Sequence, residues 1–241
     1  METIHRYADA GHLAQGVAKT LLRRLIELQE GGRVATLCLT GGRIANCIYV
    51  ELGGLVEGSG LDTGLLELWW GDERFVPTDD PIRNAGPTLG VLAGRFPLDP
   101  ARTHPMPAAD GVVDNASSAA TYAKELDDTV FDICLLGMGP DGHVASIFPG
   151  HPSFEENSHT VIGVNDAPKE PSERISLTVP ALNRSREVWY VVVGDEKTDA
   201  VRRSVAGDRS IPAGVVRGTE RTRWLLDSAA AAELPYHCCE F

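Results

Sequence analysis

The sequence has no long apolar segment and little positive charge. No run of about 18 apolar residues occurs, so no transmembrane helix is expected. The first ten residues are polar and charged, so no secretory signal is predicted. With 22 basic and 34 acidic residues, the formal net charge is −12. This balance disfavours nucleic acid or an anionic membrane as a partner, because both attract clustered Lys and Arg.

Cysteine is also scarce, with five residues in the whole chain, an odd number. Cys38 and Cys134 lie inside apolar runs and are interpreted as small core residues. We therefore predict a cytoplasmic, reducing location and no disulfide framework. His237-Cys238-Cys239 lacks a second ligand pair at the usual metal spacing and is interpreted as a tail. No metal or other cofactor is predicted.

The chain does contain enough apolar material for one large core. It has 241 residues, of which 43% are hydrophobic. Short apolar runs predict strands at 34–39, 65–70, 103–106, 133–136, 174–179, 188–193, 211–215 and 223–226. Helical spacing predicts helices at 13–28, 44–55, 84–93, 115–129, 197–205 and 229–234.

This alternation of strands and helices predicts an α/β fold: an open, mostly parallel sheet flanked by helices on both faces. Linker-like composition and internal repeats are absent, so a single domain over residues 1–241 is expected. The segment 151–173 is rich in Pro, Ser and charge and is predicted to be a mobile flap. Trp69 and Trp70 are expected in the core.

Polar clusters follow four of the expected strands. They are Thr40-Gly41-Gly42, Asp72-Glu73-Arg74, Asp141-Gly142-His143, and Gly194 to Lys197. Ligands of open parallel sheets bind beyond the carboxyl ends of the strands, so these clusters are expected to meet there. A Gly-rich turn before a helix directs N–H groups at an anion. Lys197, in the first turn of a helix, opposes the macrodipole and so suits an anionic ligand.

Each cluster also has a simpler structural interpretation. Thr40-Gly41-Gly42 can be a plain tight turn, and Asp72-Glu73-Arg74 a solvated loop. Lys197 can be an ordinary surface lysine. His143 can be a hydrogen-bonded histidine of a loop or of the core.

Taken together, the motifs resemble the 6-phosphogluconolactonases, in the superfamily that includes glucosamine-6-phosphate deaminase. The matching stretches occur in the family's order between Leu39 and Lys197. They are L-T-G-G at 39–42, W-G-D-E-R-F-V-P at 70–77, L-L-G-M-G-P-D-G-H-V-A-S-I-F-P-G at 135–150, R-I-S-L-T at 174–178 and V-V-V-G-D-E-K at 191–197. The stretch G-x-G-x-D-G-H-x-A-S-x-F-P-G is the most specific of them.

The resemblance implies a Rossmann-like fold of the sugar-phosphate isomerase type. It implies hydrolysis of 6-phospho-D-glucono-1,5-lactone to 6-phosphogluconate in the oxidative pentose phosphate pathway. The implied partner is this small sugar-phosphate lactone, with no nucleic acid or membrane, and the protein is expected to be a monomer or weak homo-oligomer. The implied substrate-binding residues are Thr40, Gly41, Gly42, Asp72, Arg74, Asn84, Arg174 and Lys197.

The resemblance also implies that His143 is the general base. An ordinary imidazole titrates near ~6.5, so neutral His143 can take a proton from water and later give it to the ring oxygen. Asp141 is expected to orient the imidazole. The sequence departs from the family after Gly42, where members often carry hydroxyl residues and this chain has Arg43. Arg43 is therefore predicted to supply a bidentate phosphate contact instead.

Three alternatives remain. A glucosamine-6-phosphate deaminase usually has a Glu soon after D-G-H and D-E-Y for D-E-R, whereas 144–149 has no carboxylate and position 74 is Arg. A dinucleotide-binding enzyme fits G-x-G-x-x-G at 137–142, but Asp141 would lie close to the pyrophosphate and Pro149-Gly150 would end the following helix early. A non-catalytic sugar-phosphate sensor would keep the phosphate loop without needing His143.

Overall fold

The chain is built around a parallel sheet. The structure is a computed structural model and describes residues 1–235. Within them, this main sheet has seven strands in the order β1-β10-β9-β6-β2-β3-β5, and each adjacent pair is parallel. Its strands are β1 (Glu2–Tyr7), β2 (Ala35–Leu39), β3 (Leu66–Trp70), β5 (Thr103–His104), β6 (Ile133–Leu136), β9 (Glu187–Val192) and β10 (Arg221–Asp227).

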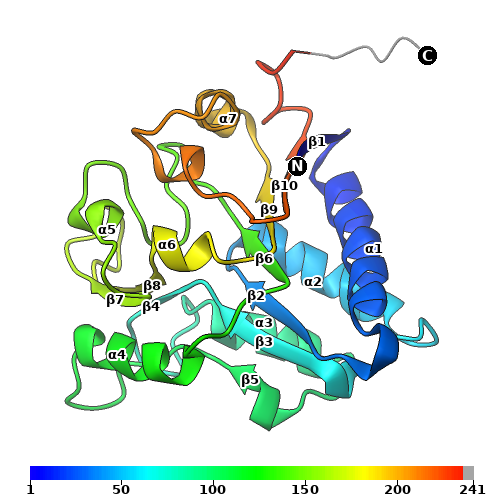
Figure 1. The fold of residues 1–241 in the computed structure, drawn as a ribbon, viewed down its shortest axis with the longest axis horizontal. Helices are drawn as coiled ribbons and strands as arrows, with labels where there is room; N and C mark the ends of the chain where they lie inside the picture. The colour runs from blue at the N-terminus through cyan, green and yellow to red at the C-terminus, as the bar shows by residue number, and fades with distance from the viewer. Residues whose placement is uncertain (236–241) are drawn as a thin grey trace.

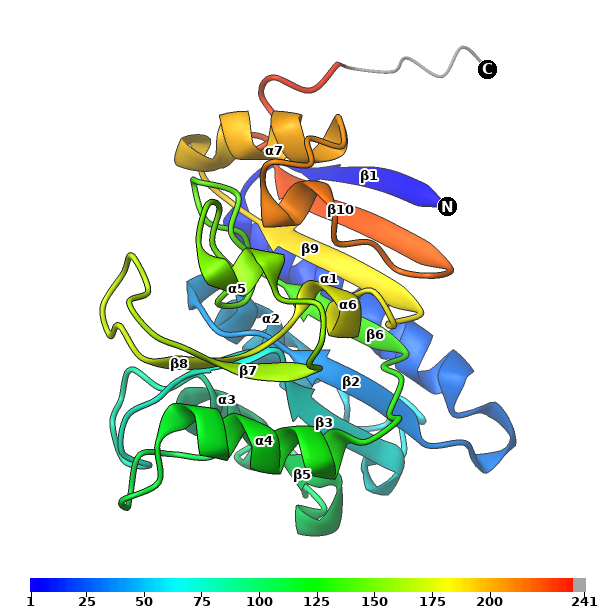
Figure 2. The same ribbon diagram turned by 60° about the vertical axis from the view of Figure 1, so that its left-hand side comes forward.

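Helices cover both faces of the main sheet, as the sequence predicts. In Figures 1 and 2, α1 and α2 lie side by side on one face, and α4, α6 and α7 lie on the other. The α-helices are α1 (Ala10–Leu28), α2 (Arg43–Leu55), α3 (Ala85–Ala93), α4 (Asn115–Leu126), α5 (Pro152–Glu155), α6 (Val179–Leu182) and α7 (Thr198–Val205). Short 3₁₀ turns are η1 (Glu30–Gly32), η2 (Thr63–Leu65), η3 (Pro100–Arg102), η4 (Asp195–Lys197) and η5 (Pro212–Gly214).

Local sequence explains where the helices begin and which face they bury. Asp9 caps α1 by accepting a hydrogen bond from the N–H of His12. The leucines predicted for this helix form its buried face. In α4, which begins at Asn115, the capping residue is Asp114, which accepts from the Ser117 N–H.

A second sheet stands at the carboxyl edge of the main one. It has three antiparallel strands in the order β4-β8-β7, namely β4 (Asp72–Arg74), β7 (Val161–Val164) and β8 (Arg174–Leu177). Gly71 joins the two sheets: its N–H donates to the Leu39 carbonyl at 3.0 Å, and its carbonyl accepts from the Leu177 N–H at 2.9 Å. The small sheet therefore presents its side chains to the edge where strands of the main sheet end.

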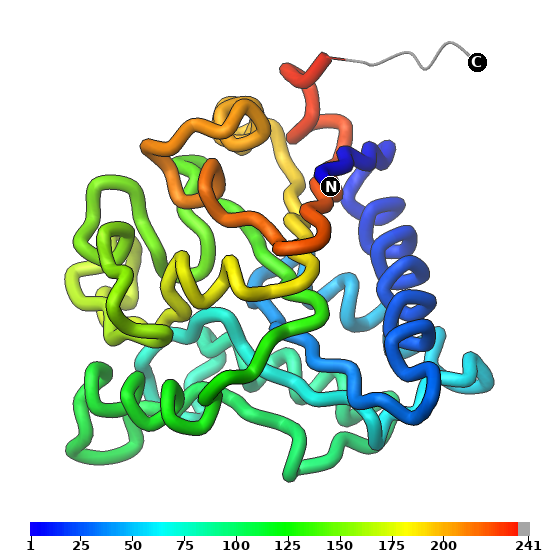
Figure 3. The backbone as a smooth tube through the Cα atoms, in the orientation of Figure 1, coloured from blue at the N-terminus to red at the C-terminus, as the bar shows by residue number. Residues whose placement is uncertain are grey.

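Several sequence predictions are wrong. The segment 151–173 is not a loop throughout, because it contains α5 and β7; its mobility stays a prediction. Residues 211–215 form the 3₁₀ turn η5 and not a strand; Pro212 has no N–H to donate to a strand ladder. Residues 229–234 form turns and not a helix. Strand β1 was not predicted, because Glu2–Tyr7 is mostly polar; it pairs with β10 at the sheet edge (Figure 3).

The core confirms the interpretation of the buried residues. Trp69 and Trp70 are buried, and so are Cys38 and Cys134, which are register partners on β2 and β6. One continuous hydrophobic cluster joins the main sheet to its helices. This cluster fits a single domain, which stays a prediction. His237-Cys238-Cys239 lies outside the described residues.

Two further observations concern the alternatives. Across residues 1–235, no helix combines the length and apolar character needed to cross a bilayer. After β6 the chain makes a tight turn and then an isolated bridge between Val144 and Ile147, with no crossover helix. The arrangement expected of a dinucleotide-binding strand-turn-helix unit is therefore missing at 137–150.

Candidate active site

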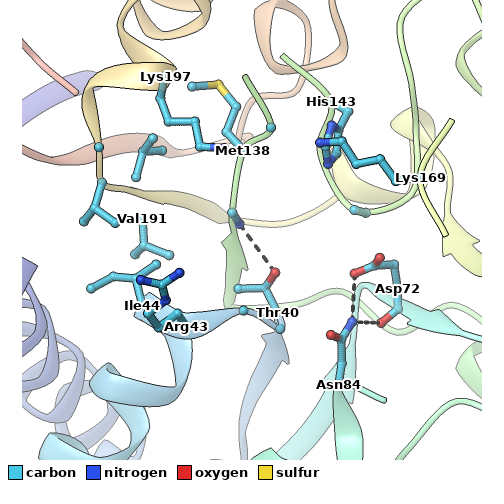
Figure 4. Close-up of a pocket in the computed structure, with 18 of the residues that line it drawn as sticks. Thr40, Arg43, Ile44, Asp72, Asn84, Met138, His143, Lys169, Val191 and Lys197 are labelled. Carbon is cyan, nitrogen blue, oxygen red and sulfur yellow. Dashed lines mark hydrogen bonds between the residues drawn. The ribbon is translucent and has the colours of Figure 1, made fainter. Parts of the chain in front are cut away.

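A cavity of about 620 Å³ opens at the carboxyl edge of the main sheet, beside the small sheet (Figure 4). All the predicted substrate-binding residues line it: Thr40, Gly41, Gly42, Arg43, Asp72, Arg74, Asn84, Arg174 and Lys197. His143 lines it as well, whereas Asp141 lies outside the lining and contacts His143. The fold thus gathers the motifs that the sequence places at separate strand ends.

The turn after β6 fixes the position of the His143 side chain. The Gly139 N–H donates to the His143 carbonyl at 2.9 Å, and the Gly142 N–H donates to the Gly139 carbonyl at 3.0 Å. Gly142 has φ of +82°, a conformation that glycine adopts without the strain of a Cβ. His143 Nδ1 lies 2.5 Å from Asp141 Oδ1. With Nδ1–H donated to the carboxylate, neutral His143 has its lone pair on Nε2.

Asp141 is held in its ionised form by this contact. Burial alone would raise the pKa of its carboxyl group, but the hydrogen bond and charge of His143 outweigh that and lower the pKa to about 2. Because the folded pKa is depressed, the ionised carboxylate stabilises the fold above pH ~4 and loses that contribution as the pH falls toward 2. Asp141 is therefore an anion at neutral pH, where its carboxylate can accept a hydrogen bond from His143.

Gly139 leaves the space that the His143 and Asp141 side chains occupy. A Cβ on Gly139 would lie 2.0 Å from both Cε1 and Nδ1 of His143, and 2.4 Å from Asp141 Oδ1. Contacts this short cannot be accommodated without moving the imidazole. The glycine before D-G-H is therefore a packing requirement of the His143–Asp141 pair.

The first Gly-rich turn has the backbone arrangement that suits an anion. Thr40 is buried, and its N–H and carbonyl both bond to the Tyr49 hydroxyl, at 3.1 Å and 2.8 Å. Gly42, with φ of +102°, is the N-cap of α2 and supplies no capping side chain. Gly42 and Arg43, the first residue of α2, line the cavity, and the first N–H groups of a helix have no partner within it.

Lys197 approaches the same region from the turn after β9. It ends η4 and directly precedes α7, so the prediction of a lysine at the start of this helix is confirmed. Burial lowers the pKa of Lys197 below its usual range; nearby Lys169 adds to this effect, and Glu196 and Asp141 oppose it. A partly desolvated ammonium gains most from an anionic ligand. Figure 4 shows Lys197 and Arg43 on one side of the cavity, and His143 and Asp72 on the other.

Asp72 is held firmly at the His143 side. It is buried, and its Oδ2 accepts from the Ser146 hydroxyl at 2.7 Å while its Oδ1 accepts from Asn84 Nδ2 at 3.3 Å. Asn84 in turn accepts a hydrogen bond from Arg74. Ser146 belongs to the D-G-H-x-A-S motif, but the sequence alone gave it no role. The structure shows that it holds the Asp72 carboxylate.

Glu73, between the two cavity residues Asp72 and Arg74, points the other way. Its carboxylate accepts from the N–H groups of Asn84 and Ala85, at 2.6 Å and 2.9 Å, and so caps α3. Burial raises the pKa of Glu73, and the bonds from these N–H groups oppose it. Alternation along β4 thus separates two cavity residues from a structural one.

Arg174 lines the cavity, but its guanidinium also holds a loop. Nε donates to the Pro171 carbonyl at 2.7 Å, and Nη2 donates to the carbonyls of Lys169 and Glu170 at 2.9 Å and 3.3 Å. Lys169 and Glu170 line the cavity and were missed by the sequence analysis. Their loop has no periodicity, so only its position next to the R-I-S-L-T motif could have indicated them.

The sequence from 8 to 224 matches the family described as glucosamine-6-phosphate isomerases/6-phosphogluconolactonase. A 6-phosphogluconolactonase of Streptomyces coelicolor is 44% identical, over 96% of this chain and 94% of that protein. The chain belongs to this family. The match confirms the family and the hydrolase class that the sequence predicts.

Solved structures of the family have the same fold. A 6-phosphogluconolactonase from Thermotoga maritima superposes with a TM-score of 0.84 at 26% identity, covering 94% of this chain and all of that one. A monomeric glucosamine-6-phosphate deaminase superposes with a TM-score of 0.79 at 22% identity, covering 95% and 99%. Since lactonase and deaminase share the fold, only the residues in the cavity distinguish the two chemistries.

Proposed function

We propose that this protein hydrolyses 6-phospho-D-glucono-1,5-lactone to 6-phospho-D-gluconate, with His143 as general base. The observation that carries the proposal is that the cavity has two chemically different sides. An anion site at Arg43, Lys197 and the start of α2 faces a His143–Asp141 pair across it. The substrate has the same division, with a phosphate at one end and a lactone carbonyl at the other. The names of the curated relatives support the same reaction.

The phosphate is held by charge and by backbone N–H groups. The turn at Thr40-Gly41-Gly42 and the start of α2 supply the N–H donors. Lys197 supplies a point charge, and Arg43 a planar guanidinium able to bind two phosphate oxygens. With its phosphate bound, the substrate has its lactone ring positioned in front of His143. Water can then attack the carbonyl from a fixed orientation.

Hydrolysis then proceeds in two steps. Water attacks the lactone carbonyl carbon as its proton passes to Nε2 of His143, giving a tetrahedral oxyanion and an imidazolium paired with Asp141. The bond from that carbon to the ring oxygen then breaks, and the imidazolium returns its proton to the departing oxygen. The products are the open-chain hydroxyl and a carboxylic acid, which loses its proton to solvent. The cations that line this part of the cavity stabilise the oxyanion.

The first experiment measures loss of lactone that is generated fresh from glucose 6-phosphate, against the spontaneous rate. We expect clear acceleration, and no ammonia release from glucosamine 6-phosphate, because residues 144–149 supply no carboxylate for the ring-opening step. Ammonia release without lactone hydrolysis would replace this proposal with the deaminase. Binding of sugar phosphates without either reaction would indicate the sensor.

Asp141→Asn should lower kcat for lactone hydrolysis, because it removes the carboxylate that accepts from His143 Nδ1–H and leaves the lone pair on Nε2. Asp141, with a pKa of about 2, stays ionised above pH 5 and takes no proton itself. The measurement is kcat and KM of both proteins on fresh lactone. An unchanged kcat would show that Asp141 does not orient His143 for the reaction.

The remaining expectations belong to the same proposal. We infer one domain that acts in the cytoplasm as a monomer or weak homo-oligomer, on a sugar-phosphate lactone and without nucleic acid or membrane. The net charge of −12 supports the absence of a polyanionic partner. Light scattering on a concentration series tests the oligomeric state.

A further inference from the structure

Lys169 is a second lysine in the cavity, and the sequence motifs do not include it. It lies in the loop between β7 and β8, and its side chain lines the same cavity as His143. In Figure 4 it extends on the side of His143 and Asp72, opposite Arg43 and Lys197, although its charge still reaches Lys197 and contributes to lowering the pKa of that lysine. Lys169 is exposed although it lines the cavity, so its side chain is open to solvent and to an entering ligand.

The loop that carries Lys169 is held at both ends by backbone bonds. The Ala167 N–H donates to the Ser172 carbonyl at 3.0 Å, and the Phe75 N–H donates to the Glu173 carbonyl at 3.0 Å. Ala167 packs with Phe148 and Val164 in a small apolar cluster. Both ends of the loop are therefore fixed to the rest of the structure.

Arg174 holds the middle of the loop. Three carbonyls in a row, of Lys169, Glu170 and Pro171, accept from its guanidinium. The main chain of Lys169 is thus fixed by a buried side chain of the small sheet, although its own side chain is exposed. The planar guanidinium of arginine has several N–H donors in a fixed arrangement and can bond to all three carbonyls, whereas the compact ammonium of lysine cannot.

The charge on each side of the cavity indicates what Lys169 binds. The phosphate side already has Arg43, Lys197 and the start of α2. On the side of His143, the reaction develops a negative charge on the carbonyl oxygen, and the product keeps a carboxylate there. The buried carboxylate of Asp72 on this side would repel both. Arg74 and Arg174 also line the cavity here, but their guanidinium groups donate to Asn84 and to the loop carbonyls, so a further cation is favoured at this end.

We propose that Lys169 binds the reacting end of the substrate, pairing with the developing oxyanion and with the product carboxylate, and that Arg174 is a positioning residue acting through Lys169. This inference rests on the proposed function. Lys169 contributes its charge only and exchanges no proton with the substrate. Arg174, predicted from the resemblance to bind substrate, here contributes by holding the loop that presents Lys169.

The decisive experiment compares two ligands that differ at one end. 6-Phosphogluconate has a carboxylate where 6-phosphoglucitol has a neutral hydroxymethyl group, and both keep the phosphate. Calorimetric titration of Lys169→Ala should show about 10-fold weaker binding of 6-phosphogluconate, while 6-phosphoglucitol changes by less than about 2-fold. Lys169→Arg should restore most of the difference. Steady-state assays of Lys169→Ala should show a lower kcat with a smaller change in KM.

Two lysines provide matched controls. Lys197→Ala should weaken both ligands by the same factor, because it removes a phosphate contact. Lys19→Ala, on the exposed face of α1, should change neither. If Lys169→Ala weakens both ligands equally, Lys169 binds phosphate and the inference is wrong. If it weakens neither, Lys169 has no role at the reacting end.

Arg174 is tested through the same preference for a carboxylate. Arg174→Lys should reduce the ratio of the two affinities as Lys169→Ala does, and the double variant should reduce it no further. A purely structural role would lower both affinities and leave the ratio unchanged, which would overturn the positioning role. If the wild type does not hydrolyse the lactone, the proposed reaction is wrong. A preference for the carboxylate that depends on Lys169 would still support this site.

Discussion

His143→Ala is expected to lower kcat for lactone hydrolysis by about 10²–10⁴-fold, the usual contribution of a positioned general base. Binding of 6-phosphoglucitol should stay within about 2-fold, because the phosphate is held on the other side of the cavity. The measurement is initial-rate kinetics on fresh lactone, corrected for spontaneous hydrolysis, with calorimetry for binding.

A second histidine beside a carboxylate is the control. His159 Nδ1 lies 3.2 Å from Glu156 Oε1 on an exposed part of the chain, and His159→Ala should leave kcat unchanged. If His143→Ala were as active as the wild type, the imidazole would not be the base. Asp72, the buried carboxylate on the same side of the cavity, would then be the candidate.

Gly139→Ala is expected to lower kcat/KM by about 10²-fold without removing any functional group. The added Cβ would lie 2.0 Å from the His143 ring, so the imidazole must move away from its position against Asp141. Displacement of a catalytic group by about 1 Å is enough for a loss of this size. The measurement is kcat/KM together with the melting temperature, to separate misplacement from unfolding.

Gly54→Ala is the matched control for this substitution. Gly54 is exposed on α2, and a Cβ there would have nothing within 4 Å. It should preserve kcat/KM and, by favouring the helix, slightly raise the melting temperature. Wild-type activity of Gly139→Ala would show that the turn tolerates a side chain and that the close approach has no consequence for His143.

Much of the site could be predicted because parallel strands share an edge. Thr40, Asp72, His143 and Lys197 each come soon after a strand, and strands that run the same way bring their C-terminal turns to one edge of the sheet. Apolar runs of five or six residues, such as Val188 to Val193, indicated the strands themselves. Local pattern and one rule of topology were therefore enough to place these residues together in a cavity.

The small sheet could not be predicted by the same reasoning. Strand β4 is only Asp72–Arg74, and β7 is four residues inside a polar segment, so neither is long enough to show the alternation of apolar and polar residues that indicates a strand. The pairing of β4 with β8 brings together residues about 100 positions apart in the chain, a relation that local sequence does not encode. Lys169 was missed for this reason, since its place depends on bonds from Arg174.

In the proposed function, the two sheets contribute differently. The turns proposed to bind phosphate and the turn of His143 follow strands of the main sheet, whereas Asp72, Arg74 and the loop of Lys169 belong to the small sheet and its connections. Substitutions in the small sheet can therefore alter the contacts to the reacting end of a sugar phosphate while the turns proposed to bind the phosphate stay unchanged. A scaffold organised in this way lets related proteins change the reaction that they catalyse while they keep the same means of binding a sugar phosphate.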